Sequence, residues 1–137
     1  MAGCTLSTSL SKAYIRPAIR SVEEVQGHEI CEHVDDVSQL TIKHNTISAL
    51  MTAVTQGSRL AAGLEATDLK ISDKSVVIAN VPGLASRVAR QLRNKGFPVN
   101  AAIQSEDLGV STRGGNVRTT RSMEDWIGKA SKRARIV

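Results

Sequence analysis

The sequence predicts an α+β fold in which antiparallel β-hairpins pack with two to four helices. Three observations lead to this prediction. Two strand-like runs, residues 29–34 and 37–42, flank a pair of acidic residues and place that pair at the tip of a hairpin. A long amphipathic helix follows the hairpin. Short β-rich runs then alternate with a second amphipathic helix.

The first two helices are predicted from spacing and capping. Residues 5–20 form a helix whose apolar stripe is Leu6, Leu10, Ala13 or Tyr14, and Pro17, and we expect Pro17 to break or kink it. Asn45 is a good N-cap for the next helix. Apolar residues recur after Asn45 at steps of three and four, to about residues 62–64.

The second half of the chain predicts short strands around another helix. Residues 69–71 and 75–79 have the composition of two strands joined by a turn at 72–74, which predicts a second hairpin. Pro82 suits the first turn of a helix that ends at Gly96 and Pro98. The outer face of this helix is basic and is interpreted as solvated; it carries Arg87, Arg90, Arg93 and Lys95. Residues 99–104 and 108–110 are expected to be strands, and a short helix is expected to begin at Ser122.

Composition bounds the class of protein. A chain of 137 residues is one domain or a piece of one, and with one Trp, one Tyr and one Phe its core must be aliphatic. No apolar run approaches the roughly 18 residues that a membrane span needs, and no secretory signal is visible. Cys4 and Cys31 are isolated thiols, which favours a reducing compartment. We therefore expect a soluble, intracellular protein without a membrane partner.

The positive charge is concentrated at the C-terminal end. The net charge is +5, and residues 113–137 carry seven basic residues against two acidic ones, so residues 1–112 are balanced. Basic tails of this kind bind nucleic acid by neutralising phosphates. The candidate nucleic-acid-binding residues are Arg113, Arg118, Arg121, Lys129, Lys132, Arg133 and Arg135.

The acidic pair Asp35-Asp36 is the strongest candidate for chemistry. A tight turn presents both carboxylates to one Mg²⁺ ion, whereas a regular strand points neighbouring side chains to opposite faces. The pair by itself is more often just a turn, because Asp side chains hydrogen-bond their own backbone. The segments on either side of the pair decide between the two interpretations.

The order of motifs resembles the palm of retroelement reverse transcriptases. A glycine- and serine-containing helix start at residues 2–17 comes first, and then the hairpin His33-Val34-Asp35-Asp36 and a helix. A strand pair carrying Lys74-Ser75 follows. In that family these segments are called motifs B, C and D. Residues 106–110, Glu-Asp-Leu-Gly-Val, match a further segment that follows the palm, so the resemblance covers nearly the whole chain.

The resemblance implies a role for each motif. Asp35 would be the metal ligand and Asp36 the supporting carboxylate for catalytic Mg²⁺, and Lys74 would stabilise charge or donate a proton near the triphosphate. Gly3 and Ser7 would contact the template base and the incoming nucleotide. His33 would lie in the nucleotide pocket, where the family usually has an aromatic residue. The implied partners are an RNA template and a DNA primer.

The resemblance also implies a partial enzyme. Residues 1–112 would be a partial palm, and residues 113–137 a basic tail with a short helix. No strand with a metal-binding aspartate precedes Gly3, and the fingers are missing. We therefore expect a fragment of an RNA-directed DNA polymerase that is inactive alone and belongs with the N-terminal part of a longer polyprotein.

Three alternatives use the same residues. The first is a zinc site made by His28, Cys31, His33 and Asp35, although the spacing matches no standard zinc pattern. The second is a hydrolase, which is disfavoured because no Gly-x-Ser-x-Gly motif is present. The third and strongest is a non-catalytic nucleic-acid-binding module built on the basic tail, which would otherwise be merely solvated. Residues 132–135 are also faintly similar to a nuclear localisation signal.

Overall fold

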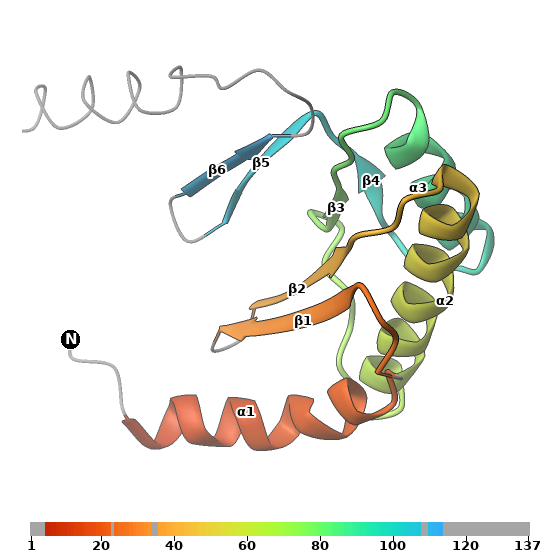
Figure 1. The fold of residues 1–137 in the computed structure, drawn as a ribbon. Helices are drawn as coiled ribbons and strands as arrows, with labels where there is room; N and C mark the ends of the chain where they lie inside the picture. The colour runs from red at the N-terminus through yellow and green to blue at the C-terminus, as the bar shows by residue number, and fades with distance from the viewer. Residues whose placement is uncertain (1–4, 23, 34–35, 108–109, 114–137) are drawn as a thin grey trace, which may run out of the picture.

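The computed structural model describes residues 5–22, 24–33, 36–107 and 110–113. Within this part of the chain there are three helices and three two-stranded sheets, which confirms the predicted α+β class. The elements form an arc in Figure 1, with α1 below the β1–β2 hairpin, α2 and α3 on one side, and the β5–β6 hairpin above. No helix among the described residues is long and apolar enough to cross a membrane.

The first helix, α1 (Thr5–Arg20), is continuous through Pro17, so the expected break does not occur. Its buried face also differs from the prediction. Ile15 and Ala18 are buried, whereas Leu10 and Tyr14 are 61% and 62% exposed. The predicted stripe was wrong because only the last turns of α1 reach the rest of the protein, and the residues that face inward there are offset from Leu10 and Tyr14.

The predicted hairpin is confirmed, although Asp36 is the first residue of the second strand rather than part of the turn. Strands β1 (His28–His33) and β2 (Asp36–Thr41) pair antiparallel, from His28 opposite Thr41 to His33 opposite Asp36. Gly27 starts the hairpin with φ +73°, and a Cβ there would lie 2.2 Å from the Ile42 carbonyl oxygen. The Gly27 carbonyl accepts a hydrogen bond from the Ile42 N–H at 2.7 Å, so the glycine closes the open end of the hairpin.

The long helix α2 (Thr46–Glu65) begins as the sequence predicts. The Asn45 side-chain oxygen accepts hydrogen bonds from the Ile47 and Ser48 N–H groups at 2.7 and 3.4 Å. These bonds satisfy two of the amides that the first turn of a helix leaves free. The helix then continues past Gly57 to Glu65.

The second half of the chain differs from the predicted hairpin. Residues 69–71 form no strand, and β3 (Val76–Val77) pairs in parallel with β4 (Asn100–Ala101). Helix α3 (Leu84–Asn94) connects β3 and β4. Parallel strands need such a crossover, and the amphipathic helix provides it. The predicted strand 99–104 is accordingly split between β4 and the next strand.

The last described elements form another hairpin. Strand β5 (Gln104–Asp107) pairs antiparallel with β6 (Val110–Arg113), with Asp107 opposite Val110. β6 includes Arg113, so the strand crosses the boundary that we expected between residues 112 and 113. The tail beyond it, and the short helix predicted from Ser122, lie outside the described residues.

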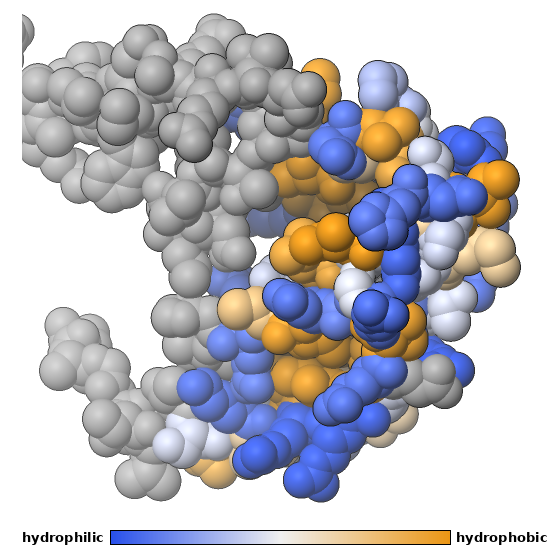
Figure 2. Space-filling model, viewed as in Figure 1, coloured by the Kyte–Doolittle hydropathy of each residue, from blue (hydrophilic) through white to orange (hydrophobic). Residues whose placement is uncertain are grey.

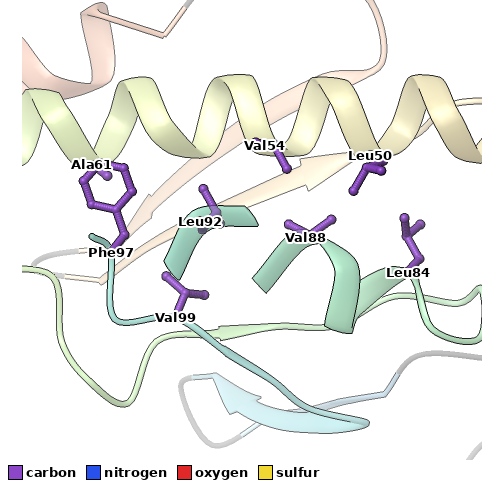
Figure 3. Close-up of a cluster of buried hydrophobic side chains, with 8 residues drawn as sticks. All are labelled: Leu50, Val54, Ala61, Leu84, Val88, Leu92, Phe97 and Val99. Atoms are coloured by element: carbon purple, nitrogen blue, oxygen red, sulfur yellow. The ribbon is translucent and has the colours of Figure 1, made fainter. Parts of the chain in front are cut away.

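Two hydrophobic clusters hold these elements together, and α2 contributes to both. The larger cluster joins α2 to the β3–α3–β4 unit and is drawn in Figure 3; it consists of Leu50, Val54, Ala61, Leu84, Val88, Leu92, Phe97 and Val99. The smaller cluster joins α2 to α1 and the first hairpin through Ala18, Val22 and Leu60, with Ile30 and Val37 packed against them. Phe97 is the one aromatic residue in the two clusters, in line with the predicted aliphatic core.

Helices α1 and α2 approach closely at Gly63. A Cβ at this position would lie 2.8 Å from Ala18 Cα and 2.8 Å from Ser21 Oγ. A Cβ at Gly57, also in α2, would meet the Leu92 methyl groups at 3.4 and 3.5 Å, which is close to ordinary van der Waals contact. Of these two glycines of α2, Gly63 is therefore the one that the packing requires.

This difference predicts opposite effects for the same substitution. We expect Gly63→Ala to lower the free energy of unfolding by about 1 to 3 kcal/mol through overpacking. Gly57→Ala should leave it unchanged or raise it by up to about 1 kcal/mol through helix propensity. Urea unfolding of both variants measures the effect. Equal stabilisation by the two substitutions would contradict the close contact between α1 and α2.

Candidate functional site

The candidate site is the tip of the β1–β2 hairpin. Asp36 is the first residue of β2 and lies opposite His33, so residues 34 and 35 connect the strands. Asp36 is exposed. Its alternation with Val37 places it on the outer face of the hairpin, together with Cys31 and Ser38. Asp36 is therefore available to solvent and to a ligand.

The other predicted active-site residues are placed only in part. Gly3 and Asp35 lie outside the described residues. Ser7 is in the first turn of α1, and His33 is the last residue of β1, in both cases with the backbone alone described. The two residues that the structure does bring together are His33 and Asp36, as the closing pair of the hairpin.

Lys74 lies in the turn before β3 and is exposed. Its backbone N–H donates to Ser72 Oγ at 3.2 Å. Two further hydrogen bonds connect this turn to β4, from the Asn100 N–H to the Ser75 carbonyl and from Asn100 Nδ2 to the Asp73 carbonyl, at 2.9 and 3.1 Å. The strand pair that was expected to carry Lys74 is therefore replaced by the parallel β3–β4 pair.

Metal-binding residues do not gather elsewhere in the part of the chain that is described. No group of three or more His, Cys, Asp or Glu side chains there is arranged to hold a metal ion. His28 and Cys31 are three residues apart on β1 and so face opposite sides of the strand, which argues against the zinc alternative. Among the described residues, Asp36 is the acidic group that the hairpin tip offers to Mg²⁺.

The inner face of the hairpin carries polar groups that sequence reasoning missed. His28 and Glu32 point inward with Ile30, and each has a buried atom without a hydrogen-bond partner, His28 Nε2 and Glu32 Oε1. Gln56 of α2 is only 2% exposed and its Oε1 is also unpaired. Gln39 of β2 donates to the Gln56 carbonyl at 3.5 Å. A glutamine among the apolar residues of α2 was the sequence sign of this polar interior.

A shallow groove lies between the end of α1 and the inner face of β1. It has a volume of about 560 Å³ and is lined by Ile19, Arg20, Val22, Glu24, His28 and Ile30. Figure 2 shows hydrophobic side chains gathered on this side of the molecule, with charged and polar side chains around them. His28 closes one side of the groove, where its Nδ1 lies 3.0 Å from Thr41 Oγ1.

Of the seven predicted nucleic-acid-binding residues, one lies within the described part of the chain. Arg113 is the last residue of β6, with only its backbone described. The other six candidates, Arg118, Arg121, Lys129, Lys132, Arg133 and Arg135, lie outside the described residues.

The comparisons with known proteins identify no family. No protein-family model, no curated protein and no solved structure matches the chain. The likeness to reverse transcriptases therefore depends on the motifs and their order.

His28 makes folding depend on pH. Burial, and then the nearby Lys43 charge, lower the pKa of His28 below its ordinary value. The unfolded chain therefore takes up this proton first as the pH falls below about 6.5. The stability contribution of neutral His28 is complete above that pH and decreases toward the folded-state pKa.

We expect the urea midpoint to fall between pH 7 and pH 5, and to fall less in His28→Gln. His44→Gln, at an exposed histidine, is the matched control. Equal pH dependence in His28→Gln and the wild-type protein would contradict the burial of His28.

Proposed function

We propose that the chain is part of the palm of a retroelement reverse transcriptase. The observation that carries the proposal is the β1–β2 hairpin, whose closing pair is His33 and Asp36 and which lies between α1 and α2. The order of helix, acidic hairpin and helix is the order of motifs B and C and the helix that follows them. The parallel β3–β4 pair is the part of the fold that the motif order did not predict.

Under this proposal the hairpin tip carries the metal-binding carboxylates. Asp35 and Asp36 would hold Mg²⁺, which supplies charge stabilisation for nucleotidyl transfer when it is bound. A complete two-metal site needs a further carboxylate from another strand, and the described residues form no group of three or more His, Cys, Asp or Glu side chains that could hold a metal ion. The missing ligand would come from a preceding part of a longer protein, so the proposal expects no polymerisation by the chain alone.

Divalent-ion binding tests the hairpin directly on the isolated chain. We expect Mn²⁺, a paramagnetic substitute for Mg²⁺, to broaden the backbone amide signals of residues 33–36 selectively in nuclear magnetic resonance spectra. The broadening should disappear in the Asp35→Asn, Asp36→Asn variant. It should persist in Asp68→Asn, Asp73→Asn, which neutralises two exposed acids elsewhere. Uniform broadening, or broadening that survives at the tip, would show that these carboxylates do not bind the ion.

Primer extension tests the enzymatic part of the proposal. The chain is expressed within the longest reading frame that contains it and is given an RNA template, a DNA primer and Mg²⁺. Asp35→Asn, Asp36→Asn should reduce extension by about 100-fold or more, because the metal contributes several kcal/mol to the transition state. The Asp68→Asn, Asp73→Asn control should retain activity. Undiminished extension by the first variant would rule the hairpin out of the mechanism.

A further inference from the structure

We propose that the outer side of α3, with the turn before β3, is a surface that binds the phosphate backbone of nucleic acid. We call it the α3 surface and define it by its five exposed basic residues, Lys74, Arg87, Arg90, Arg93 and Lys95. It shares no residue with the hairpin tip or with the basic tail. Binding at this surface needs neither a metal ion nor catalysis, so it goes beyond the proposed function.

The packing of α3 dictates which side is free. Leu84, Val88 and Leu92 are buried in the larger cluster against α2. Arg87, Arg90 and Arg93 recur every three residues on the remaining side, at a rise of about 4.5 Å per step. Guanidinium groups bind phosphate through two parallel hydrogen bonds.

Asn100 of β4 connects the helix to the turn. Its Oδ1 accepts a hydrogen bond from Arg93 Nη1 at 3.4 Å, and its Nδ2 donates to the Asp73 carbonyl at 3.1 Å. Arg93 is thereby held beside the turn that carries Lys74. Arg93 therefore joins the turn to α3, and Arg90 and Arg87 follow it along the exposed side of the helix.

The charge pattern favours a bound polyanion over a simple solvated face. Residues 74–104 contain five basic residues and no acidic one. A solvated helix commonly pairs opposite charges at three- and four-residue steps, whereas like charges at these steps repel. The negative end of the helix dipole stabilises the positive charges of Arg93 and Lys95. It does not stabilise those of Arg87 and Arg90 in the middle of α3. An anionic partner removes the repulsion that the sequence leaves in place.

The exposed side chains of α3 select among polyanions. Besides the arginines they are Ser86, Gln91 and Asn94, with no apolar or aromatic residue among them. A helix that lies on a membrane needs an apolar side to insert, so a lipid surface fits poorly. These positions offer no aromatic side chain for base stacking. The partner is therefore a nucleic acid, contacted through its phosphates without sequence readout.

The test measures the affinity of two triple variants of the full chain for a labelled single-stranded RNA. EDTA is present so that no divalent metal ion contributes to binding. Arg87→Gln, Arg90→Gln, Arg93→Gln removes three charges from α3. Lys12→Gln, Arg16→Gln, Arg20→Gln removes three exposed charges from α1 and is the matched control. The salt slope is the slope of the logarithm of the binding constant against the logarithm of the salt concentration. Each phosphate contact to a single strand contributes about 0.7 to this slope, or about fivefold in affinity at 0.1 M salt.

We expect the α3 triple variant to lose about 100-fold in affinity at 0.1 M salt and about 2 units of salt slope. The α1 triple variant should change by less than about threefold, and Arg90→Gln alone should lose about fivefold. The single variant keeps the test valid if the triple variant unfolds, which circular dichroism detects. Equal losses in the two triple variants would overturn the proposal, as would unchanged RNA binding by Arg90→Gln. The proposal would also be overturned if the α3 triple variant lost binding to phosphatidylserine vesicles but kept its binding to RNA.

Discussion

The burial of α2 on two of its sides is the constraint on which the rest of the structure depends. Leu50, Val54 and Ala61 pack against the β3–α3–β4 unit, while Leu60 packs against α1 and the first hairpin. Neither two-stranded sheet beside α2 has enough apolar surface to be stable by itself. Each is stable because it covers a side of the same helix. The hairpin and α3 therefore keep a fixed relation through α2, although neither belongs to the other's cluster.

This packing explains why Asp36 faces solvent. The α1–α2 contact at Gly63 and Ala18 places the end of α1 against the hairpin, and Ile30 and Val37 of the hairpin pack against that corner. Since neighbouring residues on a strand point to opposite faces, the use of Val37 in packing directs Asp36 outward. The outward direction of the acid is thus a consequence of the core, and it does not by itself depend on any ligand.

The sequence predicted those elements whose determinants are local. Asn45 and the apolar spacing after it located α2, and the two alternating runs located the acidic hairpin. The sequence failed where a distant partner decides the structure. Residues 69–71 looked like a strand, but Ile71 packs on the α2–α3 cluster and β3 pairs instead with β4, more than twenty residues away. An apolar run on each side of an amphipathic helix was the pattern that would have predicted this parallel pair.

The candidate site was predictable in position but not in surroundings. The hairpin tip follows from sequence, whereas the unpaired His28, Glu32 and Gln56 atoms on the inner side arise only when α2 covers the hairpin. The same limit applies to α3. Its basic residues were visible in the sequence as an ordinary solvated face, and the link from Arg93 through Asn100 to the turn that carries Lys74 appears only in the folded chain.

Charge of opposite sign is separated along the chain in a way that suits binding of a polyanion. Residues 23–36 contain six acidic residues and no basic one, and residues 74–104 contain the reverse pattern. The two charged segments pack on α2 through the two hydrophobic clusters, and Gly57 of α2 lies beside both Gln39 of β2 and Leu92 of α3. A nucleic acid held at the α3 surface could approach the hairpin carboxylates only where cations neutralise them.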